Sequence, residues 1–162
     1  MDDLETIYRQ HAPALLRFAW GMCGDRSRAE DIVSEAFVRL LTKAPRLETR
    51  TALAYLLAVA RNAFLDGARQ RRREVPLPDV VRAPGRDPDD RIDDAKRLRA
   101  VMQALRVLPE GERAALLLRV DHELPYDEIA RVLGTSIAAA KVRVHRARLR
   151  LAGARDTRGE QR

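Results

Sequence analysis

The sequence of 162 residues contains few cysteine and aromatic side chains. Cys23 is its only cysteine, which excludes a disulfide framework and a zinc cluster of thiolates, and we expect it to be a small buried hydrophobe. Aromatic residues make up 4% of the chain, whereas hydrophobic residues make up 46%. This composition suits helices rich in Leu, Ala and Val better than strands. We therefore expect an all-α protein.

Other features that would indicate a membrane protein or an enzyme are missing. No apolar run approaches the roughly 18 residues of a membrane span, and the N-terminus has no signal-peptide core, so we expect a cytoplasmic protein without membrane insertion. There is no glycine-rich phosphate loop, and His11 and His122 stand far apart. The acidic run Asp87 to Asp94 lacks the order of a calcium loop, and Asp31 and Glu35 have no histidine beside them. We predict no catalytic residue, no metal site and no cofactor.

The charge of the chain is strongly one-sided. The formal net charge is +7 and the isoelectric point is about 10.4. Most of the positive charge is arginine, whose planar donor fork suits phosphate groups and base edges. A polyanion is the expected partner, although net charge alone is equally compatible with a solvated basic surface.

The first 73 residues have the periodicity of three helical segments. Pro13 is expected to divide the first segment, and Gly21 and Gly24 to loosen the chain after it. Ser27 and Glu30 fit a capping box at the start of a helix that runs from about Arg28 to Thr42. The predicted inward side chains of the three segments are Leu4, Ile7, Tyr8, Leu15, Phe18, Ala19, Met22; Ala29, Val33, Ala36, Phe37, Leu40, Leu41; and Leu53, Leu56, Leu57, Ala60, Ala63, Phe64.

Residues 74–94 differ in composition from the rest of the chain. They contain four of the eight prolines, and seven acidic residues against three arginines. This stretch predicts an acidic, flexible linker between an N-terminal domain of residues 1–73 and a C-terminal domain of residues 95–155.

The C-terminal domain has the pattern of a helix-turn-helix. Leu98, Val101, Met102, Leu105 and Leu108 face inward on its first helix, and Pro109 then stands at the start of a helix that buries Ala114, Leu117 and Leu118. A short helix from Tyr126 to Leu133 is stopped by Gly134, and Ser136 caps the helix that follows. Two helices joined by this turn form the predicted motif.

The last helix has two different faces. Ile137, Ala140, Val144, Ala147 and Leu151 form one narrow apolar stripe, which we assign to the core. The opposite face, flanked by arginines and Lys141, has the shape and charge to lie in a major groove. The alternative is a solvated basic helix packed on its neighbours.

Three stretches in this order resemble the ECF sigma factors, the minimal two-domain promoter-recognition subunits of bacterial RNA polymerase. They are "DRSRAEDIVSEAFVRLL", "AYLLAVARNAFLDGARQRRR" and "LPYDEIARVLGTSIAAAKVRVHRARLRL", with the acidic proline-rich linker between the second and the third. The resemblance extends from about Leu4 to Leu151.

The resemblance implies roles for particular residues. Asp31, Ser34 and Glu35 correspond to the surface that docks on the clamp helices of the largest subunit of core RNA polymerase. Residues of the segment that reads and opens the minus-ten element are Tyr55, Arg61, Asn62, Arg69, Arg71, Arg72 and Arg73, and the loop Pro45 to Thr51 corresponds to the pocket for a flipped non-template base. Residues at the minus-35 element in duplex DNA are Ser136, Lys141, Val142, Arg143, His145 and Arg146. An anti-sigma protein is a further implied partner.

The chain departs from the family pattern at several positions. The family usually has Gln, Trp and Gly where Ser34, Tyr55 and Glu123 stand, and its common Gly-Thr-Val-Lys-Ser-Arg reads Ala-Ala-Ala-Lys-Val-Arg at residues 138–143. Two hydroxyl donors are therefore absent, which changes the expected promoter sequence. The alternative function, a stand-alone helix-turn-helix regulator of duplex DNA, explains the last helix but leaves residues 1–73 without a role.

Overall fold

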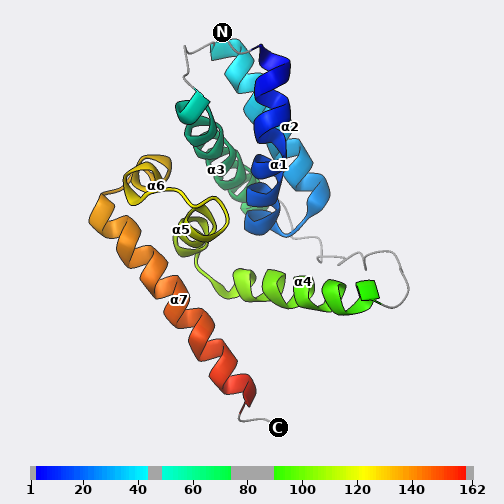
Figure 1. The fold of residues 1–162 in the computed structure, drawn as a ribbon, viewed down its shortest axis with the longest axis vertical. Coiled ribbons are helices and arrows are strands. Elements are labelled where there is room, and N and C mark those ends of the chain that lie inside the picture. Colours follow the sequence, from blue (N-terminus) through cyan, green and yellow to red (C-terminus); the bar gives the residue numbers. More distant parts are fainter. Residues whose placement is uncertain (1–2, 44–48, 74–89, 160–162) are drawn as a thin grey trace.

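The computed structural model describes residues 3–43, 49–73 and 90–159, and within these ranges every regular element is an α-helix (Figure 1). The predicted fold class is confirmed. The helices are α1 (Leu4–Cys23), α2 (Arg26–Lys43), α3 (Thr49–Arg73), α4 (Asp90–Val107), α5 (Glu110–Val120), α6 (Tyr126–Leu133) and α7 (Ile137–Gly159).

Helix α1 continues through Pro13, so the prediction that this residue divides the segment is wrong. Proline removes one backbone N–H and the hydrogen bond that it would donate. The flanking side chains of His11 and Leu15 are buried, so packing on both sides of Pro13 holds the two parts in one helix. Gly24, with a φ of 72°, forms the left-handed cap that ends α1.

The start of α2 also differs from the prediction. The helix begins at Arg26, and the backbone N–H of Ser27 donates to the Asp25 side chain at 3.0 Å. Asp25 therefore caps the helix, and Ser27 lies inside it instead of forming a capping box with Glu30. Aspartate is as good a cap as serine, so the local pattern did not distinguish the two positions.

Helix α4 leaves the rest of the molecule as an arm (Figure 1). It begins at Asp90, so the last five residues of the predicted linker are helical, whereas residues 74–89 lie outside the described residues. Leu105 and Leu108 at the inner end of the arm, the latter just past α4, are buried as predicted. Leu98 and Val101 are exposed, contrary to the prediction, because the arm extends past its neighbours and no described helix covers that face.

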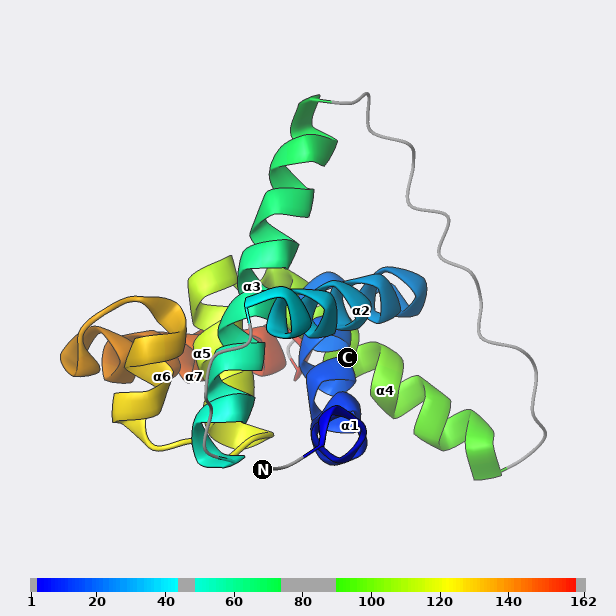
Figure 2. The same ribbon diagram turned by 90° about the horizontal axis from the view of Figure 1, so that it is seen from above.

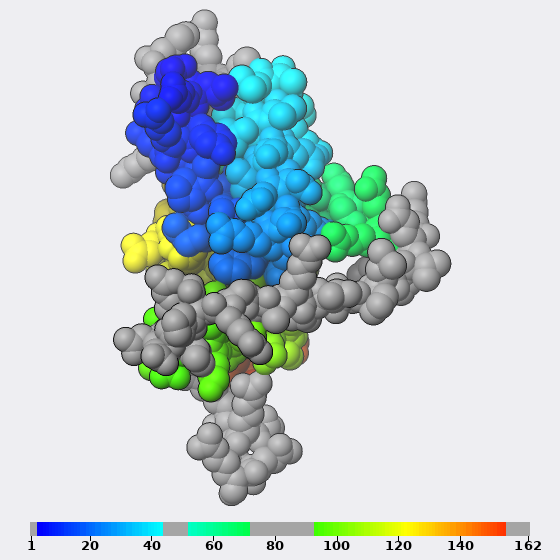
Figure 3. Space-filling model, turned by 90° about the vertical axis from the view of Figure 1, so that its right-hand side faces the viewer, coloured from blue at the N-terminus to red at the C-terminus, as the bar shows by residue number. Residues whose placement is uncertain are grey.

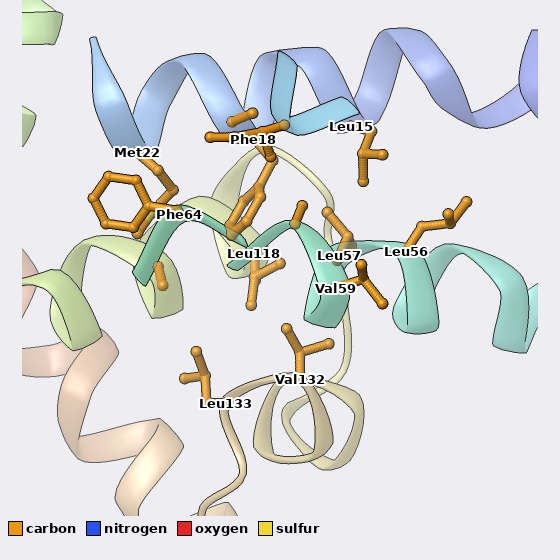
Figure 4. Packing of buried hydrophobic residues seen from close by; sticks show 14 of the residues in the cluster. Leu15, Phe18, Met22, Leu56, Leu57, Val59, Phe64, Leu118, Val132 and Leu133 are labelled. Carbon is orange, nitrogen blue, oxygen red and sulfur yellow. The ribbon is translucent and has the colours of Figure 1, made fainter. Parts of the chain in front are cut away.

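The N-terminal helices pack directly on the helix-turn-helix part. Helix α5 contacts α1, and α6 contacts α3 (Figure 2). Side chains from α1, α3, α5 and α6 converge in one apolar cluster, which includes Phe18, Leu57, Leu118 and Val132 (Figure 4). The two parts therefore share one hydrophobic core.

Helices α1 and α5 approach closely at Gly21, which is buried inside α1. A Cβ atom at this position would lie 2.8 Å from Leu117 Cδ1, so this leucine would have to shift. The expectation that Gly21 loosens the chain is therefore wrong. Its missing side chain lets the two helices meet.

The predicted inward faces are mostly buried, with exceptions at helix ends. Leu56, Leu57, Ala60, Ala63 and Phe64 of α3 are all buried. Besides Leu98 and Val101 of the arm, the exposed exceptions are Leu4, Tyr8, Leu41 and Ile137. Leu4, Leu41 and Ile137 lie in the first or last turn of their helices, where the neighbouring helix no longer covers them.

Candidate nucleic-acid and polymerase interfaces

The buried stripe of α7 is confirmed except at its first residue. Ala140, Val144 and Ala147 are at most 1% exposed, and Leu151 packs against the same core. Ile137 is 48% exposed because side chains point toward the N-terminus of a helix, and here the helix begins. Three side chains of the opposite face, Val142, His145 and Arg146, are exposed.

The turn before α7 has the predicted geometry. Helix α6 ends at Gly134, which has a φ of 62°, and the backbone N–H of Ala139 donates to Ser136 Oγ at 3.1 Å. Ser136 is thus the N-cap of α7 as predicted. Its hydroxyl is engaged with the helix that it starts, although the residue itself is exposed.

Lys141 is held near the start of α6 by an aromatic side chain. Its Nζ atom lies 5.7 Å from the centre of the Tyr126 ring, and the guanidinium carbon of Arg119 lies 4.5 Å from the same ring. Both distances are within the range of a cation–π interaction. One ring therefore gathers a positive charge from α5 and another from α7 at the edge of the helix-turn-helix.

Two arginines of α7 turn back onto α5. A Cβ atom on Gly111 would lie 3.4 Å from Arg143 Nη1, so the half-buried Arg143 side chain covers this glycine. Arg150 Nε donates to Glu112 at 2.7 Å, and this carboxylate is almost completely buried. In this conformation both arginines contribute to the packing of α7.

The predicted minus-ten residues of α3 lie in three different environments. Asn62 is exposed, and Tyr55 is half-buried and packs against the core. Arg61 points into the contact between α3 and the helix-turn-helix part, where its side chain is 13% exposed. The three residues do not form one open surface in this conformation.

The basic end of α3 is helical. The helix extends to Arg73 and projects from the bundle, and Arg69 and Arg71 are exposed (Figure 2). The side chains of Arg72 and Arg73 lie outside the described residues, as do residues 45–48 of the loop Pro45 to Thr51. The remaining residues of that loop, from Thr49 on, begin α3.

The predicted docking strip lies on the outer face of α2. Asp31, Ser34 and Glu35 are all exposed, and Figure 3 shows α2 beside α1 on an open face of the molecule. Glu35 accepts a hydrogen bond from Arg39 at 2.6 Å, and Arg39 also lies 3.9 Å from Asp66 of α3. Asp31 and Ser34 have no such partner among the contacts of the described side chains, which leaves them open to another protein.

Both histidines that stand apart in the sequence have lowered pKa values. Burial lowers the pKa of His11. Burial also lowers the pKa of His122, and Arg17 adds to this effect, whereas Asp121, 3.5 Å away, opposes it. The rings of His122 and of Phe18 in α1 form a T-shaped pair, with 6.1 Å between ring centres. Neither histidine belongs to a group of potential metal ligands in the described part of the chain.

Sequence reasoning missed one residue that the structure makes prominent and noted another only as a departure from the family pattern. Glu110 forms an ion pair with Arg61, 49 positions away, and no local pattern indicates this pairing. Glu123 has a φ of 53°, a left-handed conformation that disfavours residues other than glycine. The departure from the family glycine at this position was the available signal for the second residue.

Comparisons with known proteins agree with this architecture. Residues 7–74 match the family model described as Sigma-70 region 2, and residues 98–151 match the one described as Sigma-70, region 4. The chain is 34% identical over 156 residues to the ECF RNA polymerase sigma factor SigE of Mycolicibacterium smegmatis, which covers 93% of this chain and 61% of SigE. It is 31% identical over 157 residues to EcfG of Rhodopseudomonas palustris, which covers 93% of this chain and 83% of EcfG. The chain thus spans less than two thirds of the length of SigE.

A solved structure has a similar fold. The co-crystal structure of the sigma factor RpoE with the anti-sigma factor NepR from Bartonella quintana matches with a TM-score of 0.73 and 28% identity, over 93% of this chain and 95% of that one.

The fold and the two matched regions define a helical transcription initiation factor with a helix-turn-helix. The chain belongs to the ECF sigma factor family of bacterial RNA polymerase. Members of this class take part in transcription initiation and are not catalysts by themselves. No described helix is long and apolar enough to cross a membrane.

Proposed function

We propose that this chain binds core RNA polymerase and directs it to promoters that carry a minus-ten and a minus-35 element. The observation that carries the proposal is the presence of both matched regions in one chain. A regulator that only binds duplex DNA would need the second region alone.

Each surface suits one part of this task. The exposed strip of Asp31, Ser34 and Glu35 is acidic and can meet a basic helical surface on the clamp helices of polymerase. Helix α7 presents Val142, with its apolar side chain, between Lys141 and Arg146, so that cations reach phosphates while the small side chain approaches the base edges.

Helix α3 is assigned to the minus-ten element. Its exposed Asn62, Arg69 and Arg71 can contact a DNA backbone, and Tyr55, nearer the start of the helix, supplies an aromatic ring on which an unstacked base can stack. Arg61 joins this surface when its contact with the helix-turn-helix part opens.

We also propose an anti-sigma protein as the regulator of this chain, because a homologous fold, that of RpoE, is found in complex with the anti-sigma factor NepR. The place of action would be the bacterial cytoplasm, where polymerase and promoter DNA meet.

The direct test is gel filtration with core polymerase, followed by transcription on a genomic library with mapping of start sites. Co-elution and a common pair of promoter elements are the expected results. Tight binding to a palindrome without polymerase, and no co-elution, would instead support a stand-alone regulator.

The docking strip is tested with a matched pair of variants. Asp31→Lys should weaken core binding, because like charges then meet at the interface. Glu30→Lys makes the same change of charge on the same helix, beside the strip, and replaces an exposed carboxylate paired with Arg26 at 3.4 Å. Both should keep the melting temperature of the wild type. Equal core affinities of the two variants would contradict the assignment of the strip.

A further inference from the structure

The strongest polar contact between the N-terminal helices and the helix-turn-helix part is made by Arg61. Its Nε donates to Glu110 Oε1 at 2.7 Å, and its Nη2 donates to Glu110 Oε2 at 3.0 Å. Its Nη1 donates to the backbone carbonyl of Leu133 at 3.2 Å. All three nitrogens of the guanidinium are therefore occupied by groups of the other half of the molecule.

Each acceptor lies at a helix end that suits its charge: a carboxylate is favoured at the N-terminus of α5, and a carbonyl at the C-terminus of α6 favours a cation. Glu110 is the first residue of α5, and Leu133 is the last residue of α6, so its carbonyl belongs to the negative end of that helix. A carboxylate that accepts two parallel hydrogen bonds from one guanidinium has the same geometry as a phosphate bound by arginine. The environment of Arg61 in this chain thus resembles the one that a DNA backbone would provide.

We propose that Glu110 acts as an internal mimic of a DNA phosphate, which occupies Arg61 and keeps the free chain in a closed conformation. Promoter DNA and Glu110 then compete for the same guanidinium, and DNA binding by α3 requires the two halves to separate. This inference rests on the proposed function, which assigns Arg61 to the minus-ten segment.

The remaining contacts between the halves support a closed state that is held by more than one interaction. Arg17 of α1 pairs with Asp121 at 3.3 Å, and Arg113 of α5 donates to the backbone carbonyl of Met22. The apolar cluster around Phe18 and Leu118 supplies the burial (Figure 4). The Arg17–Asp121 pair is exposed and therefore weak, so Arg61–Glu110 is the pair that couples closure to a DNA-binding residue.

Closure affects the two predicted DNA surfaces differently. Arg61 on α3 is occupied, whereas Val142, His145 and Arg146 on α7 remain exposed. In the closed chain the predicted minus-35 surface is accessible while part of the predicted minus-ten surface is covered. Closure should therefore lower the affinity of the free protein for single-stranded DNA.

The first experiment measures closure without DNA. Spin labels on cysteines introduced at the exposed positions Gln10 of α1 and Arg131 of α6 report the distance between the halves by pulsed electron paramagnetic resonance, with the buried Cys23 left in place. The wild type should give one narrow distance distribution, and Glu110→Arg a longer and broader one. Glu110→Gln, which keeps the size of the side chain but removes its charge, should give an intermediate distribution. An unchanged distribution in Glu110→Arg would overturn the role of this pair.

The second experiment measures competition, with a fluorescein-labelled single-stranded oligothymidylate as the probe. Glu110→Gln should raise the affinity of the free protein at least five-fold. The matched control is Glu112→Gln, which removes a carboxylate of the same helix that pairs with arginine at the same distance of 2.7 Å, but its partner Arg150 lies in the same half of the chain. The control should stay within two-fold of the wild type, and its thermal unfolding shows whether it is folded.

Equal affinities of the two variants would overturn the competition between Glu110 and DNA. A different result would contradict the proposed function: neither the wild type nor Glu110→Gln would co-elute with core polymerase. If the distance between the spin labels still increased in Glu110→Arg, the closed conformation would exist without a role in promoter recognition.

Discussion

Two valines of α7, two positions apart, test the assignment of its faces. Val144 is 1% exposed in the core, whereas Val142 is 45% exposed on the face assigned to DNA. Replacing each by alanine removes the same two methyl carbons from the same helix. Any difference in stability between the variants therefore comes from the environment of the side chain.

The expected magnitudes follow from burial. Removal of two buried carbons costs about 1.6 kcal/mol in transfer free energy, and the cavity that remains raises the loss to about 2 to 3 kcal/mol. The higher helix propensity of alanine returns about 0.5 kcal/mol in both variants. Val144→Ala should thus lose about 2 kcal/mol of unfolding free energy, and Val142→Ala should lose nothing or gain up to about 0.5 kcal/mol.

The assay is urea unfolding followed by far-ultraviolet circular dichroism. An unchanged slope with a shifted midpoint would show that stability alone has changed. For a chain of this size the loss in Val144→Ala corresponds to about 4 to 8 °C in melting temperature. Equal losses in the two variants, or a loss below about 0.5 kcal/mol in Val144→Ala, would refute the assignment of the buried face.

Three further predictions concern single residues. Glu123→Gly should stabilise the chain by about 0.5 to 1 kcal/mol, because the φ of 53° strains a residue with a side chain, and a lower melting temperature of the variant would contradict this. Burial lowers the pKa of His122 from its ordinary value of 6.5, so the unfolded chain takes up a proton first. The contribution of His122 to the unfolding free energy should be constant above this pH and fall as the pH drops below about 6.5, so the fall should be shallower in His122→Gln. Urea titrations at about pH 7.5 and about pH 5.5 measure this loss, and an equal loss in the wild type and in His122→Gln would contradict the prediction. Arg146→Ala should fold normally, since Arg146 is exposed, and should cost about 1 to 3 kcal/mol of promoter discrimination if the arginine contacts a guanine edge. A uniform loss across DNA sequences, with a weaker salt dependence, would indicate a phosphate contact, and a melted variant would contradict the exposed position.

Local features of the fold were predictable from the sequence because each depends on neighbours along the chain. The helix from Tyr126 to Leu133 and its stop at Gly134 follow from spacing and from the conformational freedom of glycine, and both are confirmed. The buried stripe of α7 follows from the helical repeat. Local rules were weaker where several residues suit the same role, as at Asp25 and Ser27, or where a pattern extends past the helices that cover it, as at Leu41.

The sequence by itself thus determined the class of the fold, the helix-turn-helix and most inward faces, along with the resemblance that the comparisons confirmed. Only the tertiary structure decided that Arg61 donates hydrogen bonds to Glu110 and the Leu133 carbonyl, and that the Leu117 side chain packs against Gly21. Helical periodicity specifies which side of a helix is apolar, but not which other helix covers it or at which height. That choice depends on the fit of side chains between helices far apart in the chain. The same fit determines whether Arg61, a predicted DNA-binding residue, is accessible.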